Sequence, residues 1–201
     1  MPTRPSPSQP DLFGAESPAP TEPSGLAYQQ EFITQSEELK LINMVLALPL
    51  RPASYKQYTA QRRVVNFGWS YDYDNNVLLD APQVPAEFDF LRERVAAWSG
   101  VAPSSFAQLL VADYAPRTPL GWNRDVPDYE VIAGISLGSA ATLRFRPYPP
   151  TQGRKYAVRE LQVEPRSAYS MRGPARWKWQ HSVPPTPGQR WSLTFRTLAK
   201  R

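Results

Sequence analysis

The chain of 201 residues contains no cysteine, only one histidine and no long apolar run. The absence of cysteine excludes disulfide bonds, thiolate metal sites and a cysteine nucleophile. No segment approaches the roughly 18 apolar residues of a membrane span, and the N-terminus lacks the apolar core of a signal peptide. We therefore expect a soluble, monomeric protein of the cytoplasm with no membrane partner. The missing cysteine fits that compartment without proving it.

Acidic residues are scarce toward the C-terminus. Residues 141–201 contain thirteen Lys and Arg but only two acids, Glu160 and Glu164, a balance of +11. Residues 1–140 contain ten bases and sixteen acids, a balance of −6. Such an asymmetry favours a polyanionic partner, with nucleic acid the first candidate. The alternative is a solvated basic surface without a partner.

The first 25 residues are rich in proline, serine and threonine and contain few large apolar side chains. A segment of this composition cannot bury enough apolar surface to offset the entropy lost on ordering, so we predict a disordered tail over residues 1–25. The remaining residues, 26–201, are long enough to form one domain with its own core.

Two helices are predicted in the first half of the chain. Thr34–Glu37 matches a capping box, and apolar residues at helical spacing follow it until Pro49. A second helix is predicted from about Pro85 to Trp98. Between the two, Arg62–Asp74 is rich in aromatic and β-branched residues and ends at Asp74–Asn76, a sequence typical of a hairpin turn.

From Phe106 onward the chain is rich in β-forming residues. Seven short runs are separated by turn sequences: Phe106–Tyr114, Val131–Leu137, Thr142–Arg146, Val158–Val163, Ala168–Arg172, Arg176–Ser182 and Trp191–Thr197. Many short strands at this spacing are typical of a sandwich or barrel. We therefore predict an α+β, mainly β fold, in which two N-terminal helices pack on a double-stranded β-helix, or jelly-roll, core.

The last predicted strand has one polar and one apolar face, because alternate residues of a strand point to opposite sides. The polar face comprises Arg190, Ser192, Thr194 and Arg196, and the apolar face Trp191, Leu193 and Phe195. If the apolar face packs beneath the helices, the two arginines point into the barrel and need anions there. A dicarboxylate ligand would satisfy both, because arginine binds carboxylates bidentately. The opposite orientation, with the arginines in water, is equally compatible with the alternation.

The single histidine, His181, shares one face of its predicted strand with Trp177 and Trp179. An earlier segment, Gly121–Asp125, resembles the first half of a His-x-Asp…His iron site in which Asn123 takes the place of the first histidine. No other histidine is present to replace it.

Over roughly residues 26–198 the chain resembles the AlkB-like family of iron(II)- and 2-oxoglutarate-dependent dioxygenases. The stretches that carry the resemblance are Tyr114–Pro116, Gly121–Asp125, Gly134–Gly138, Arg144–Arg146, Gly173–Trp177, Gln180–Ser182 and Arg190–Thr197. Seven such stretches in the same order and spacing are a specific signal for the fold. The resemblance implies that the domain uses iron(II), the cosubstrate 2-oxoglutarate and O2.

The resemblance also implies roles for single residues at the cosubstrate site. Arg190 would bind the distal carboxylate of 2-oxoglutarate, with help from the hydroxyl of Tyr114. Arg196 would lie near the end of 2-oxoglutarate that chelates the metal, and Ser192 and Thr194 would be polar neighbours.

At the metal site, the resemblance assigns Asp125 and His181 as catalytic iron ligands. Asn123 stands at the third ligand position, where an amide oxygen is a weaker and harder donor than imidazole. Losing one strong ligand of three should weaken iron binding by orders of magnitude. The substitution leaves three alternatives: a weakened enzyme, a natural pseudoenzyme, or a replacement introduced to inactivate the protein.

Nucleic-acid-acting members of the family remove methyl groups from bases that leave the stack to enter the active site. The family places its nucleotide-recognition lid at the aromatic segment Phe67–Tyr73. We therefore predict that Trp69 and Tyr71 contact an alkylated DNA or RNA base, with Arg62 and Arg63 near the phosphates. The alternative is that these aromatic residues belong to the core of a sheet.

We thus predict a protein resembling oxidative demethylases of alkylated nucleic-acid bases, with activity impaired by Asn123. The alternative is a catalytically silent pseudoenzyme that uses the same surface to bind nucleic acid or a partner protein.

Overall fold

The computed structural model of the chain describes residues 23–55, 58–149 and 158–200. The predicted disordered tail lies outside the described residues except for its last three. Arg154 and Lys155, which belong to the basic C-terminal region, also lie outside them. Within the described part of the chain, no helix is long and apolar enough to cross a membrane.

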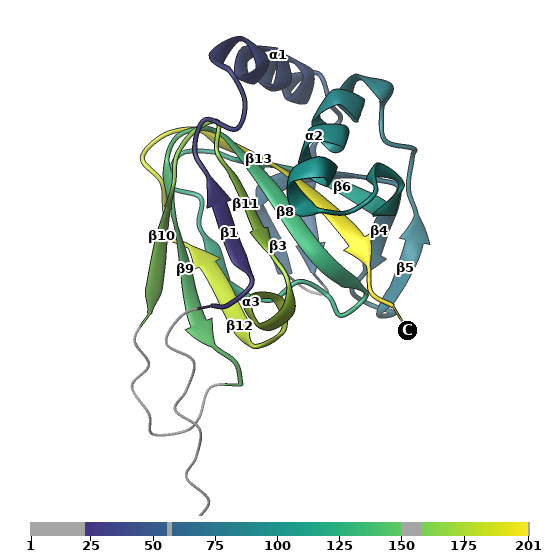
Figure 1. Cartoon of the computed structure of the whole chain (residues 1–201), viewed down its shortest axis with the longest axis vertical. Helices are drawn as coiled ribbons and strands as arrows, with labels where there is room; N and C mark the ends of the chain where they lie inside the picture. The colour runs from purple at the N-terminus through teal and green to yellow at the C-terminus, as the bar shows by residue number, and fades with distance from the viewer. Residues whose placement is uncertain (1–22, 56–57, 150–157, 201) are drawn as a thin grey trace, which may run out of the picture.

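The described strands form two large antiparallel sheets (Figure 1). The larger has the strand order β1 (Leu26–Gln29), β11 (Ala168–Met171), β8 (Tyr129–Gly138), β13 (Arg190–Leu198), β6 (Phe106–Tyr114), β3 (Tyr58–Phe67), β2 (Arg51–Tyr55). The smaller has the order β10 (Arg159–Val163), β9 (Ala141–Pro147), β12 (Trp179–Val183), β7 (Leu120–Asn123). The prediction of a mainly β protein with a jelly-roll core is confirmed.

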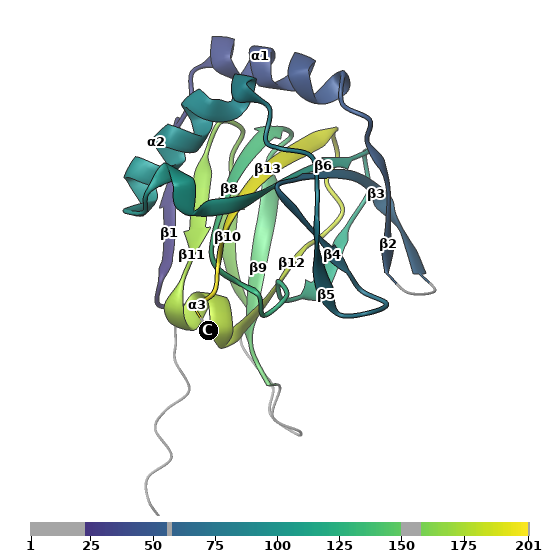
Figure 2. The same cartoon turned by 90° about the vertical axis from the view of Figure 1, so that its right-hand side faces the viewer.

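A two-stranded hairpin, β4 (Trp69–Asp72) and β5 (Val77–Asp80), lies next to β3 (Figure 2). The sequence predicts one β-rich segment over Arg62–Asp74, but Gly68 divides it into the strands β3 and β4. Its φ of +77° suits glycine, and a Cβ there would lie 2.1 Å from the carbonyl oxygen of Ala107. The predicted turn is present, and the Asp72 carboxylate accepts hydrogen bonds from the backbone N–H groups of Asp74 and Asn75 at 2.8 and 3.1 Å.

The helices are α1 (Gln35–Leu46), α2 (Asp89–Ser99) and the short α3 (Gly173–Trp177), with 3₁₀ turns at Ala86–Phe88 and Pro103–Ser105. The capping box at the start of α1 is present. The Thr34 hydroxyl accepts from the Glu37 N–H at 3.2 Å, and the Glu37 carboxylate accepts from the Thr34 N–H at 2.8 Å. Gly100 ends α2 with φ +64°.

The sequence suggested that two helices precede the strands, but the order in the structure is different. Strand β1 precedes α1, and β2 to β5 lie between α1 and α2. Strands β1 and β2 are short and lie at the two edges of the larger sheet, and β2 contains Pro52. Strands of four and five residues give few positions at which alternation can be recognised, and a proline argues against a strand, which is why the sequence pattern did not predict them.

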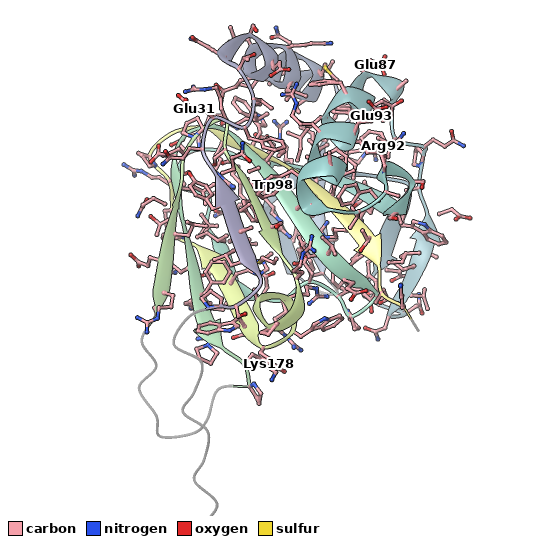
Figure 3. All side chains as sticks on the ribbon, viewed as in Figure 1. Glu31, Glu87, Arg92, Glu93, Trp98 and Lys178 are labelled. Carbon is pink, nitrogen blue, oxygen red and sulfur yellow. The ribbon has the colours of Figure 1, made fainter. Side chains whose placement is uncertain are left out.

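Apolar side chains of both long helices pack on the outer face of the larger sheet. This cluster includes Leu41 and Val45 of α1, Leu91 and Val95 of α2, Leu109 and Val111 of β6, and Leu193 and Phe195 of β13. The Trp98 ring of α2 extends the cluster and lies 5.5 Å from the ring of Phe32 (Figure 3). Because Leu193 and Phe195 lie under the helices, the polar face of β13 points between the two sheets. The structure thereby decides between the two orientations that the alternation left open.

One predicted strand, Arg176–Ser182, is wrong at its start. Gly173–Trp177 forms α3, with Pro174 in its first turn, and the strand begins only at Trp179. Trp177 is exposed, whereas Trp179 is buried in a second apolar cluster between the sheets. Trp177 therefore does not share a strand face with His181.

Candidate functional site

A cavity of about 600 Å³ opens between the two sheets. Ten of the residues predicted as functional line it: Arg62, Tyr71, Tyr114, Asn123, Asp125, His181, Arg190, Ser192, Thr194 and Arg196. They come from segments far apart in the chain, which the antiparallel pairing of β3, β6 and β13 and of β7 and β12 brings together.

Arg63 and Trp69, also predicted as substrate contacts, do not line the cavity. Neighbouring residues of a strand face opposite sides, so Arg62 points into the cavity and Arg63 away from it. Arg63 forms an ion pair of 2.5 Å with the buried carboxylate of Asp113. The Trp69 carbonyl accepts a hydrogen bond of 2.8 Å from Gln108.

Asp125 and His181 meet at one end of the cavity, where β7 pairs with β12. Asn123 and His181 are partners in this pairing, and Asp125 follows two residues after β7 ends. The Asp125 Oδ2 atom lies 4.0 Å from His181 Nε2, and its Oδ1 atom lies 2.6 Å from Arg196 Nη2. The carboxylate and the imidazole can therefore face a common ligand.

The charge states of this end follow from burial and from Arg196. Burial by itself raises the pKa of Asp125, but the guanidinium of Arg196, followed by His181, outweighs it and holds that pKa at about 2. Burial lowers the pKa of His181 below its ordinary value, although Asp125 opposes this. At neutral pH the site therefore presents a carboxylate and a neutral imidazole, the forms that bind metals.

Asn123, predicted at the third ligand position, has its amide nitrogen hydrogen-bonded to the backbone. It donates to the carbonyl of Gly121 at 2.8 Å and to that of His181 at 3.4 Å. Among the described residues, no group of three or more His, Cys, Asp or Glu side chains gathers to hold a metal. The described residues therefore do not form a full three-ligand site for iron(II), for which Asp125 and His181 would supply two ligands.

The opposite end of the cavity is an anion pocket around Arg190. This side chain is only 4% exposed, donates to the Ser136 hydroxyl at 3.2 Å and lies 5.3 Å from the ring centre of Tyr114. In the described part of the chain, no carboxylate lies within 4.0 Å of its guanidinium. Burial raises the pKa of Tyr114, but Arg62 and Arg190 outweigh it and bring that pKa below its ordinary value. A buried, unpaired guanidinium beside hydroxyl groups fits one carboxylate of a dicarboxylate ligand.

Several residues that support the site were not predicted. Gln108 is buried and accepts from Arg196 Nη1 at 3.0 Å, while its amide donates to Asn66 at 2.9 Å. Arg176 is buried and donates to the carbonyls of Val126 and Tyr129, at 2.5 and 3.0 Å, which holds the segment after Asp125. Strand alternation could have identified Gln108, because it shares a face with Tyr114. No local pattern signals the role of Arg176.

The arrangement defines a class of protein. A jelly-roll with an aspartate and a histidine at one end of its cavity and an unpaired arginine at the other is the framework of 2-oxoglutarate-dependent oxygenases. The family model described as "2OG-Fe(II) oxygenase superfamily" matches residues 25–196. The chain belongs to this family, which uses iron(II), 2-oxoglutarate and O2.

Two curated proteins are similar in sequence. An uncharacterized protein, L905 of Acanthamoeba polyphaga mimivirus, is 26% identical over 192 residues, which cover 88% of this chain and 86% of L905. Mouse ALKBH8, named tRNA (carboxymethyluridine(34)-5-O)-methyltransferase, is 25% identical over 170 residues. That match covers 81% of this chain but only 24% of ALKBH8, so the chain spans about a quarter of that relative's length.

Two solved structures share the fold. OsALKBH1 has a TM-score of 0.65 and 16% identity, with 86% of this chain and 96% of that chain covered. An oxidoreductase of the 2OG-Fe(II) oxygenase family from Burkholderia pseudomallei has a TM-score of 0.59 and 16% identity, with 88% of each chain covered. At this identity the likeness shows the fold alone.

Proposed function

We propose that this protein is an AlkB-like, 2-oxoglutarate-binding protein that acts on alkylated nucleic-acid bases, with oxygenase activity impaired by Asn123. The observation that carries the proposal is the buried guanidinium of Arg190, which faces the cavity without a carboxylate partner among the described residues. A fold tolerates an unpaired buried charge poorly, so the site is built for an anionic ligand.

The residues around Arg190 would hold 2-oxoglutarate by one carboxylate. Arg190 offers a bidentate fork, and the hydroxyl groups of Tyr114, Ser192 and Thr194 lie on the same wall of the cavity. Arg196 has a different task, because Asp125 already neutralises it. It fixes the carboxylate of Asp125 in place and holds it ionised.

Iron(II) supplies the oxidative chemistry of the family, and this chain offers it two strong ligands, Asp125 and His181. The amide oxygen of Asn123 is a poor substitute for imidazole toward iron(II). We therefore expect iron affinity far below that of a site with two histidines and a carboxylate.

A basic and aromatic face beside the cavity supports a nucleic-acid substrate. The guanidinium groups of Arg144 and Arg146 lie 5.3 and 4.5 Å from the Trp122 ring centre. Arg124 lies 3.7 Å from the ring centre of Tyr148. Guanidinium groups bind phosphates and aromatic rings stack on unpaired bases, so this face suits a nucleic-acid strand whose base enters the cavity.

A second candidate function is a catalytically silent binding module. The hydrogen bonds of the Asn123 amide to Gly121 and His181 favour it, because they hold Asn123 as part of the β7–β12 pairing. Such a protein would keep the anion pocket and the basic face but would not turn over 2-oxoglutarate.

One titration tests both candidates. Anaerobic protein is titrated with iron(II) and 2-oxoglutarate, the visible charge-transfer band is recorded, and the measurement is repeated with Asn123→His. Asn43→His, which adds a histidine on the exposed face of α1, is the matched control. We expect a weak band in the native chain, a strong band in Asn123→His and no gain in the control.

Each outcome is informative. Turnover of 2-oxoglutarate by the native chain would exclude the silent module. Binding of 2-oxoglutarate by the native chain, with turnover only in Asn123→His, would favour the module. If neither chain binds 2-oxoglutarate, the role of Arg190 is wrong. To test the substrate, a methylated oligonucleotide is incubated with Asn123→His, and loss of its methyl group is measured by mass spectrometry.

A further inference from the structure

The cavity has a strong excess of positive charge. Among the described residues, its lining contains five arginines, Arg51, Arg62, Arg124, Arg190 and Arg196, but only one carboxylate, that of Asp125. The formal charges of these six side chains sum to +4. Iron(II) and 2-oxoglutarate together carry no net charge, and 2-oxoglutarate alone would lower the balance only to +2. The positive excess therefore remains after the cosubstrate binds.

Arg62 is a half-buried arginine of the cavity to which the proposed function assigns no anionic partner. Arg196 is paired with Asp125, and Arg190 would receive 2-oxoglutarate. Within the described residues, no carboxylate lies within 4.0 Å of Arg62. Burial opposes the charge of this guanidinium, yet its pKa stays above the ordinary value because of the phenol groups beside it.

Two tyrosines hold Arg62 in position. Its guanidinium donates to the hydroxyl of Tyr55 and, at 3.3 Å, to that of Tyr114, while its Nε has no hydrogen-bond partner. Asp72 and Asp128, whose charges raise the pKa of Tyr71, do not line the cavity. Arg62 is therefore a fixed cation, and each of its two Nη atoms keeps a second N–H that can donate to a ligand in the cavity.

An aromatic wall lies beside this cation. The ring centres of Tyr55 and Tyr73 are 4.6 Å apart, those of Tyr71 and Tyr73 are 5.0 Å apart, and all three residues line the cavity. Arg62 lies 5.6 Å from the Tyr55 ring centre. A flat ring can pack on this tyrosine cluster with a substituent directed at the guanidinium.

We propose that the substrate group entering this cavity carries a negative charge, a carboxylate or a phosphate, which Arg62 binds while the attached ring packs on the tyrosine cluster. The inference rests on the proposed function for the nature of the ring and adds the charge that the substrate must carry. A base made cationic by alkylation of a ring nitrogen is disfavoured, because it would place a second positive charge beside Arg62.

A series of cytidine derivatives tests the proposal by calorimetry. The full chain, saturated with 2-oxoglutarate so that Arg190 is occupied, is titrated with cytidine, cytidine 5′-monophosphate, 5-carboxycytidine and the cationic 3-methylcytidine. We expect at least one of the two acids to bind about ten-fold more tightly than cytidine, as for a charge-assisted hydrogen bond. We expect 3-methylcytidine to bind most weakly. The acid that binds more tightly identifies the source of the charge.

Two variants test whether Arg62 causes the preference for anionic derivatives over cytidine. Arg62→Met should bind cytidine and its acids with equal affinity, and Arg62→Lys, which keeps the charge, should retain part of the preference. Arg92→Met removes an arginine from α2, outside the cavity, and should behave as the native chain (Figure 3). Thermal melts check that each variant is folded.

Three results would overturn the proposal: equal affinities for cytidine and both acids, tightest binding of 3-methylcytidine, or an anion preference that survives in Arg62→Met. The proposed function is tested separately. It fails if 2-oxoglutarate does not bind, whereas the charge of the substrate is decided by the cytidine series alone.

Discussion

The two ends of the cavity contain the same kind of side chain in opposite states. At the metal end, Arg196 is neutralised by Asp125 at 2.6 Å. At the other end, Arg190, on the same face of β13, has no carboxylate within 4.0 Å among the described residues. A buried charge that is neutralised by a protein counterion supports the fold, whereas a buried charge without such a counterion indicates a ligand. The counterion of Arg196 comes from the fold itself, whereas the charge of Arg190 is available to a ligand.

The largest expected effect is the loss of Arg196. In Arg196→Met the carboxylate of Asp125 would be buried without its ion-pair partner, which typically costs about 3–5 kcal/mol of unfolding free energy. Urea unfolding measures this cost. Arg92→Met, on the surface of α2, is the control and should change the unfolding free energy by less than about 1 kcal/mol. A small loss in Arg196→Met would mean that the pair does not support the fold.

Arg190→Met should preserve stability but weaken ligand binding, the opposite of what is expected for Arg196→Met. Arg190→Met removes an unpaired buried charge, so the melting temperature should stay the same or rise. Its affinity for 2-oxoglutarate should fall about 100-fold, because a bidentate charged contact is lost. Calorimetry and a thermal melt of one preparation test both parts. Unchanged 2-oxoglutarate affinity would remove the distinction between the two ends.

The Arg196–Asp125 pair also predicts how stability depends on pH. The pKa of Asp125 is about 2 in the folded chain, below the ordinary 3.8, so its contribution is complete above pH 4 and is lost as the pH falls toward 2. The size of this contribution is about 2 kcal/mol. Urea unfolding at several pH values, compared between the native chain and Asp125→Asn, measures it. Equal slopes below pH 4 in the two chains would contradict the assignment.

The smallest expected effect concerns the basic face outside both ends. Replacing Arg144 and Arg146 together by Gln should weaken binding of a labelled single-stranded oligonucleotide about ten-fold in low salt. The slope of log affinity against log salt concentration should correspond to about two fewer phosphate contacts. Affinity for 2-oxoglutarate should stay unchanged. Fluorescence anisotropy over a range of salt concentrations checks this. An unchanged salt slope would place the nucleic acid elsewhere.

Sequence patterns predicted the residues of the site better than their surroundings. Strand alternation placed Arg190 and Arg196 on one face of β13, and the structure confirms that this face lines the cavity. The same alternation did not place Arg63 and Trp69, because a β-rich segment does not reveal which of its faces points inward or where it breaks. Trp177 was assigned to a strand because β-forming residues surround it, although Gly173 and Pro174 start a helix there.

The side chains available for chemistry follow from the sequence alone. A chain with one histidine and no cysteine cannot form a site with two imidazole ligands or with a thiolate ligand, whatever its fold, because those donor atoms are absent. Which arginine is neutralised depended on tertiary structure. Asp125 and Arg196 are 71 residues apart in the chain and meet only through the packing of the two sheets, while the same register leaves Arg190 facing hydroxyl groups. Electrostatic pairing depends on distances of a few ångströms, and only the folded chain determines these.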